Sequence, residues 1–93
     1  MSYSLVLQSE AIIDIQEAYD WYELQKKGLG LEFLGELELG QNKICKHPEY
    51  YYSVTDIFRR LKINRFPYVI VYEIEGDTVI VIAVRHTKKK PKY

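Results

Sequence analysis

Apolar residues recur at helical spacing in the first half of the chain. They follow one another at intervals of four, three and four, which places them on one face of a helix. We predict that this helix runs from about residue 10 to residue 26 and that a short apolar strand, residues 3–7, precedes it. The residues that form the apolar stripe are Ala11, Ile15, Ala18 and Tyr22, widened by Ile12 and Tyr19.

Two glycines interrupt this pattern at Gly28 and Gly30 and allow a tight reversal of the chain. A second helix is predicted from about residue 30 to residue 46, and the two helices should form a hairpin. It ends before Pro48, because the residue preceding a proline is pushed out of the α region. Gly35 and Gly40 weaken such a helix, so we expect both to allow close approach of a neighbouring element. The side chains expected to point inward are Phe33, Leu34, Leu37, Ile44 and Cys45.

The second half of the chain has the pattern of β-strands. Strands are predicted at residues 50–54, 57–63, 66–74 and 78–84, and residues 75–77 form a hairpin turn. In the second of these strands Phe58, Arg60 and Lys62 share one face, and Arg59 lies on the other. The predicted fold class is therefore α+β, in the order β-α-α-β-β-β. We expect one domain, residues 1–93, with a helical hairpin packed on a mainly antiparallel sheet.

Charge is divided unequally along the chain, although the net charge is zero. Residues 1–58 hold ten acids and four lysines, whereas residues 59–93 hold nine bases and three acids. A basic segment of this kind is typical of a surface that binds an anionic ligand. The alternative is that the two parts neutralise each other across the fold, and the sequence leaves both explanations open.

Several classes of function are disfavoured by composition. No apolar run approaches the length that a membrane span needs, and no secretory signal is visible, so we expect a cytoplasmic protein without a membrane partner. The single cysteine, Cys45, cannot form an internal disulfide. His47 and His86 are too few, and too differently placed, to predict a metal site. We therefore expect neither a metal nor another cofactor.

Residues suited to work on nucleic acid gather in the last third of the chain. On adjacent antiparallel strands we expect Arg60, Lys62, Arg65, Arg85 and His86 to lie near one another. Arginine and lysine bind phosphate, and histidine transfers protons near neutral pH. Such a set could cleave RNA through its own 2′-hydroxyl without a metal. The simpler alternative is that the arginines pair with helix acids and that Lys88, Lys89 and Lys90 form a solvated tail.

The ordered motifs of this chain resemble the RelE/ParE superfamily of bacterial type II toxin–antitoxin toxins. The residues that carry the resemblance are Ala18-Tyr-Asp-Trp-Tyr-Glu23, Gly28-Leu-Gly-Leu-Glu-Phe-Leu34, Pro48, Arg59-Arg60, Arg65-Phe-Pro-Tyr68, Tyr72 and Val84-Arg-His86. The resemblance spans nearly the whole chain and implies the β-α-α-β-β-β fold. It also implies a partner antitoxin, whose extended or helical segment wraps the toxin.

The resemblance allows two targets. RelE-like members cut mRNA on the ribosome, and in this chain Lys62, Arg65, Arg85, His86 and Tyr93 would then be the catalytic residues. ParE-like members act on DNA gyrase. The RelE-like pattern has an arginine directly after the tyrosine of the central strand, but here Val69 follows Tyr68. The segment Arg65-Phe-Pro-Tyr68 also resembles the corresponding segment of ParE-like members more than that of RelE-like members.

We therefore favour a ParE-like gyrase inhibitor, and whether the protein is an enzyme stays open. The alternatives are a ribosome-dependent mRNA endonuclease and a non-toxic nucleic-acid-binding module descended from a toxin. Partners would be the antitoxin together with gyrase or the ribosome and its mRNA. Either a homodimer or a toxin–antitoxin hetero-oligomer is expected. Residues expected to contact the target are Arg59, Arg60, Lys88, Lys89 and Lys90.

Overall fold

The helices and strands follow one another as predicted, a strand, a pair of helices and then strands, and the two-residue β2 (Tyr52–Ser53) is the one strand that the order β-α-α-β-β-β leaves out. The structure of the protein is a computed structural model, which describes residues 3–88. Both helices begin and end within about one residue of their predicted bounds, because their apolar spacing is unambiguous. The elements are β1 (Ser4–Leu7), α1 (Ser9–Gln25), α2 (Leu29–Lys46), β2 (Tyr52–Ser53), β3 (Arg59–Lys62), β4 (Tyr68–Glu75) and β5 (Thr78–His86).

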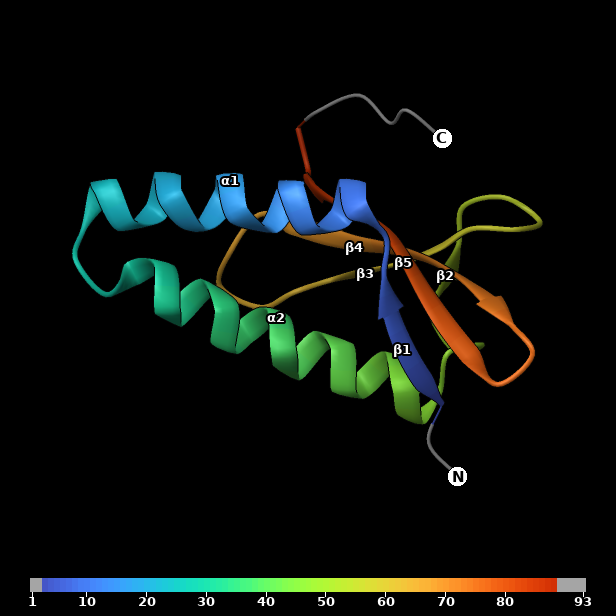
Figure 1. The fold of residues 1–93 in the computed structure, drawn as a ribbon. Helices are drawn as coiled ribbons and strands as arrows, with labels where there is room; N and C mark the ends of the chain where they lie inside the picture. Colours follow the sequence, from blue (N-terminus) through green and yellow to red (C-terminus); the bar gives the residue numbers. More distant parts are fainter. Residues whose placement is uncertain (1–2, 89–93) are drawn as a thin grey trace.

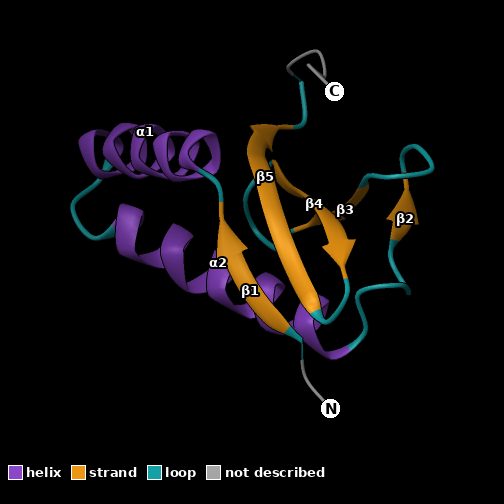
Figure 2. Ribbon diagram, turned by 45° about the vertical axis from the view of Figure 1, so that its right-hand side comes forward, coloured by secondary structure: helices purple, strands orange, loops and turns teal. Residues whose placement is uncertain are grey.

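The strands form a single five-stranded sheet in the order β1-β5-β4-β3-β2. Neighbouring strands are antiparallel except β1 and β5, which are parallel and pair from Ser4 with Thr78 to Leu7 with Val81. The two helices form a hairpin beside the sheet, and the first and last strands lie next to each other (Figures 1 and 2). The predicted fold class, a helical hairpin on a mainly antiparallel sheet, is confirmed.

The main core lies between the hairpin and one face of the sheet. Phe33 of α2 is fully buried there against aromatic rings from both layers: its ring centroid is 5.5 Å from that of Tyr22 and 5.2 Å from that of Tyr68. Tyr72 is also fully buried, and its hydroxyl donates a hydrogen bond to the Pro48 carbonyl at 2.6 Å. Burial raises the pKa of Tyr72 to about 12, so this hydroxyl remains a donor. The bond fixes the chain where α2 ends.

The opposite face of the sheet carries a smaller apolar cluster. Val69, Val71 and Ala83 are buried in it, and Phe58 packs against them. Arg60 and Lys62 of β3 are in register with Val71 and Val69. They therefore lie on the same face as this cluster, because side chains directly across a sheet share a face. We call this surface the open sheet face.

The hairpin tip is held by one carboxylate. Glu23 accepts hydrogen bonds from the backbone N–H groups of Gly28 and Gly30, both at 2.9 Å. These donors lie at the N-terminus of α2, where no helical carbonyl is available to them and where negative charge is favourable. Gly28 has a φ of 89°, a conformation that side chains disfavour. The reversal between the helices thus depends on Gly28 and Glu23 together.

Some strand bounds differ from the predictions. The strand predicted at residues 50–54 is reduced to Tyr52–Ser53, and the next begins at Arg59 instead of residue 57. The reason is local, because the Thr55 hydroxyl accepts the N–H groups of Ile57 and Phe58 and closes a loop. The third predicted strand begins at Tyr68 instead of residue 66, after Pro67, which has no N–H to donate.

The two glycines within α2 have different environments. A Cβ added at Gly40 would lie 3.1 Å from methyl groups of Ile63 and Ile70, so this position does allow α2 to approach the sheet. A Cβ added at Gly35 would meet nothing within 4 Å. The expectation of close approach is therefore confirmed at Gly40 and wrong at Gly35, which lies on the exposed side of the helix.

These environments predict opposite effects of alanine. Gly35→Ala should raise the free energy of unfolding by about 0.5–1 kcal/mol, the gain in helix propensity. Gly40→Ala has the same gain but must displace Ile63 and Ile70, at a cost of about 1–3 kcal/mol. Urea unfolding followed by circular dichroism would measure both. A Gly40→Ala variant as stable as Gly35→Ala would show that α2 does not pack as described.

Candidate functional site

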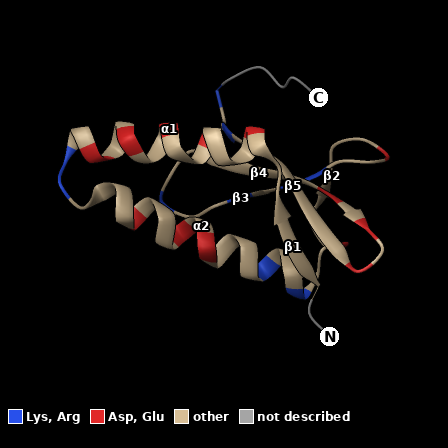
Figure 3. Cartoon of the chain, in the orientation of Figure 1, with Lys and Arg blue, Asp and Glu red and all other residues tan. Residues whose placement is uncertain are grey.

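Two of the predicted basic site residues are paired with acids of the helices. Arg65, in the turn before β4, contacts Glu32 at 2.5 Å and Glu36 at 3.7 Å, both on α2. Arg85, near the end of β5, contacts Glu10 at 2.5 Å and Asp14 at 3.5 Å on α1. Figure 3 shows acids along both helices. The fold therefore places Arg65 and Arg85, from the basic last third of the sequence, next to acids from its first half, and their charges are neutralised there.

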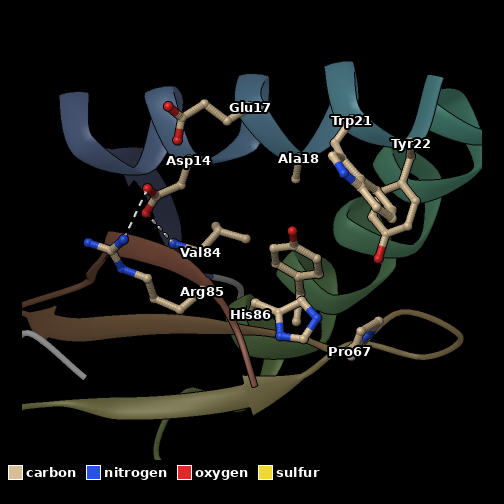
Figure 4. A pocket seen from close by; sticks show the side chains of 10 residues that line it. Asp14, Glu17, Ala18, Trp21, Tyr22, Pro67, Val84, Arg85 and His86 are labelled. Atoms are coloured by element: carbon tan, nitrogen blue, oxygen red, sulfur yellow. Dashed lines mark hydrogen bonds and ion pairs between the residues drawn. The ribbon is translucent and has the colours of Figure 1, made fainter. Parts of the chain in front are cut away.

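The Arg85 pair is nearly enclosed. The side chain of Arg85 is 11% exposed and that of Asp14 is 9% exposed. Asp14 also accepts a hydrogen bond from the backbone N–H of Val84 at 3.0 Å (Figure 4). Burial raises the pKa of Asp14, and the Val84 hydrogen bond and the charge of Arg85 counteract this rise. Within the described residues, the Arg85 Nε is buried without a hydrogen-bond partner. Arg85 thus joins α1 to β5, and its charge is already balanced.

The cations of β3 are placed differently. Arg59 donates hydrogen bonds from Nη1 to the carbonyls of Glu49 and Tyr51, at 3.1 and 2.8 Å, and so supports the loop before β2. Arg60 is exposed, and its guanidinium lies 4.9 Å from the centre of the Tyr52 ring. Lys62 is exposed and donates to the carbonyl of Ile63 at 3.0 Å. Arg60 and Lys62 therefore present charge on the open sheet face.

Val69 lies directly between two candidate catalytic residues on the neighbouring strands of the sheet. It pairs with Lys62 on one side and with Arg85 on the other. Its side chain is 7% exposed and belongs to the apolar cluster of the open sheet face. A cation at this position would stand between Lys62 and Arg85. Valine instead makes the centre of this row apolar.

A cleft of about 510 Å³ lies between α1 and the end of β5. His86 forms part of one wall, with its ring centre 5.3 Å from that of Tyr68. The Nδ1 of His86 accepts a hydrogen bond from the backbone N–H of Lys88 at 3.1 Å. In the neutral ring the proton is therefore on Nε2. Figure 4 shows His86 and Pro67 across from Trp21 and Tyr22 of α1.

The burial of the cleft affects its phenols. The pKa of Tyr68 is raised first by burial and then by the negative charges around it, including Asp14 and Glu17. The pKa of Tyr22 is raised by burial. Neither hydroxyl has a hydrogen-bond partner within the described residues. The cleft thus presents neutral phenols next to carboxylates, which is a poor environment for a phosphate.

The predicted site residues are therefore only partly brought together. Arg85 and His86 line the cleft, Arg60 and Lys62 occupy the open sheet face, and Arg65 is held against α2. Lys88 is exposed, whereas Lys89, Lys90 and Tyr93 lie outside the described residues. Their functional roles stay predictions.

Sequence reasoning missed the α1 wall of the cleft. The residues of this wall are Asp14, Glu17, Ala18, Trp21 and Tyr22. Their helical spacing could have indicated it, because Asp14, Trp21 and the residues between them recur at three and four along one side of α1. From the sequence alone, the acids of this helix are expected to be solvated; Glu17 is indeed exposed, but for Asp14 this expectation is wrong, because its side chain is only 9% exposed.

Neither a metal-binding cluster nor a membrane-spanning helix is found among the residues that the structure describes. Between residues 3 and 88, no group of three or more histidine, cysteine or acidic side chains could hold a metal ion. Over the same residues, no helix is long and apolar enough to cross a membrane.

Comparisons with known proteins identify the family and the fold. A family described as "ParE toxin of type II toxin-antitoxin system, parDE" matches residues 5–91. No curated protein sequence matches the chain significantly. A chain of a solved structure, "Chromosomal ParDE TA system from P. aeruginosa", superposes with a TM-score of 0.79 at 16% identity, covering 91% of this chain and 96% of that one. At this identity the structural match shows the fold alone.

The fold and the family match together place the protein in the RelE/ParE class of toxins, as the sequence motifs indicated. Within that class, the chain belongs to the ParE toxin family of type II toxin–antitoxin systems.

The ion pairs predict how two arginine substitutions will differ. Arg85→Ala should lower the free energy of unfolding by about 2–4 kcal/mol, because it leaves Asp14 enclosed without a counter-charge. Arg65→Ala should cost much less, because Arg65 and Glu32 are largely exposed. Chemical unfolding of both variants would measure the difference. Equal stability of the two would contradict a structural role for Arg85.

Proposed function

We propose that this protein inhibits growth by acting on DNA gyrase and that a cognate antitoxin neutralises it. Membership of the ParE toxin family supports a toxin and implies an antitoxin partner. The observation that favours gyrase over mRNA is Val69, a buried apolar residue between Lys62 and Arg85. RNA cleavage would need cations around the developing phosphorane charge. Here one neighbouring cation, Arg85, is already neutralised by Glu10 and Asp14.

The surface proposed for the gyrase contact is the open sheet face. It combines the exposed cations Arg60 and Lys62 with the exposed ring of Tyr52, above an apolar floor. Arginine and tyrosine are enriched among the residues that dominate protein interfaces. Because gyrase acts in the cytoplasm, the toxin would work there.

The surface proposed for the antitoxin is an apolar groove along the hairpin, with a volume of about 340 Å³. Ile12 of α1 and Leu31 of α2 line it and are 52% and 64% exposed. Exposed apolar side chains in a groove between helices fit the apolar face of a partner helix. The remaining residues that line the groove are Leu7, Ile15, Gln16, Tyr19 and Leu34.

The gyrase proposal is tested with purified protein, gyrase and plasmid DNA. We expect the toxin to block supercoiling or to trap cleaved DNA, and Arg60→Glu to weaken this effect about ten-fold by reversing a charge at the contact. The matched control is Lys43→Glu, the same reversal on the exposed surface of α2, which should leave inhibition unchanged.

Failure to affect gyrase, with folded protein confirmed, would contradict the proposal. Ribosome-dependent cuts in mRNA, slowed by His86→Ala, would establish the endonuclease alternative. Unimpaired growth on expression, with salt-sensitive binding of nucleic acid, would indicate the non-toxic binding module. An adjacent reading frame for a protein of antitoxin size would support the two-component module.

A further inference from the structure

The cleft beside α1 has walls that suit a planar cation. Trp21 is 55% exposed although it is the largest side chain in the cleft. Its ring lies edge-on to Tyr22, with centroids 5.1 Å apart, and Tyr68 and His86 form the opposite wall. Aromatic faces attract cations, and arginine stacks on them through its flat guanidinium. The four rings therefore form a surface on which such a group can lie (Figure 4).

The charge around the cleft is negative. Asp14 and Glu17 line the cleft on the α1 side, and Glu10 lies outside the lining but contacts Arg85. Arg85, which contacts both Glu10 and Asp14, balances only part of the charge of these three acids. No hydrogen bond or ion pair among residues 3–88 engages the Glu17 carboxylate. The negative charge of Glu17 nonetheless acts on the interior of the cleft, since it contributes to the raised pKa of Tyr68. A ligand cation would find a free carboxylate at Glu17.

We propose that this cleft binds an arginine side chain of the antitoxin. The inference rests on the proposed function, which supplies an antitoxin, and it adds a second contact to the apolar groove. The two surfaces lie on different sides of α1, because Ile12 and Tyr19 line the groove whereas Trp21 and Tyr22 line the cleft. An antitoxin segment that crosses α1 would therefore occupy both. The negative charge favours a basic side chain over the phosphates of a nucleic acid.

The test uses Trp21, the single tryptophan of the chain, as a fluorescent reporter inside the cleft. Purified toxin is titrated with N-acetyl-arginine amide, and free N-acetyl-tryptophan amide serves as the blank. We expect a saturable change with a Kd of about 1–10 mM, the range for a ligand of one residue. N-acetyl-citrulline amide, which keeps the shape and loses the charge, should bind at least about five times more weakly. Equal binding of the two would overturn the proposal.

Variants separate the cleft from non-specific effects. Glu17→Gln should weaken arginine binding about five-fold, since it removes the free carboxylate. Glu38→Gln makes the same change on the exposed surface of α2 and should bind arginine as the unmodified protein does. Both positions are exposed, so folding is preserved. If the Glu17→Gln variant binds the arginine probe as tightly as the Glu38→Gln variant does, the assignment of the cleft as the arginine site is wrong.

A second arm identifies the occupant. The cognate antitoxin should change Trp21 emission on binding, and replacing one of its arginines with glutamine should abolish this change. An antitoxin that binds tightly but leaves Trp21 emission unaltered would overturn the proposal and leave gyrase or a second copy as the source of the cation. A short single-stranded RNA that alters the emission when the arginine probe does not would overturn it in favour of a nucleic-acid site. Neither arm contains gyrase, so a wrong gyrase target would not affect them.

Discussion

The contact between Asp14 and the end of β5 determines how the helical layer is joined to the sheet. β1 covers the edge of β5 only as far as Val81, so the backbone of Val84 lies beyond the last pair of residues. An unpaired N–H at such an edge would need another acceptor, and the Asp14 carboxylate provides it. Arg85 then compensates part of the charge that Asp14 brings into this enclosed position. The same contact forms one end of the cleft, because Asp14, Val84 and Arg85 all line it.

This arrangement changes how the basic last third of the chain is interpreted. Two of its arginines stabilise the contact of the hairpin with the sheet, and Arg59 supports a loop. Arg60 and Lys62 are left to present charge on the open sheet face, where Val69 makes the centre apolar. A protein that inhibits a large enzyme by binding needs an exposed contact surface of this kind. A nuclease would need its cations free to meet phosphate.

Much of the fold could be predicted because it depends on local pattern. The spacing of apolar residues located both helices, and Gly76 with Asp77 located the turn of the last hairpin. The parallel neighbours β1 and β5 could not be predicted, because they pair residues more than seventy positions apart. The partners of Arg65 and Arg85 are also distant in sequence, on the two helices. Sequence alone could not separate Gly35 from Gly40, since their difference lies in what the sheet places beside them. The cleft was missed because its two walls, one side of α1 and the end of β5, are far apart in sequence and are brought together only by the fold.

The contact between α1 and β5 is tested most directly by a double-mutant cycle between Asp14 and Arg85. The free energy of unfolding would be measured for Asp14→Ala, Arg85→Ala, the double variant and the unmodified protein. We predict a coupling of at least about 1.5 kcal/mol, since each side chain is enclosed and each is a partner of the other. A coupling below about 0.5 kcal/mol would show that the two substitutions act independently, and it would contradict a joint role of Asp14 and Arg85 in holding α1 to β5.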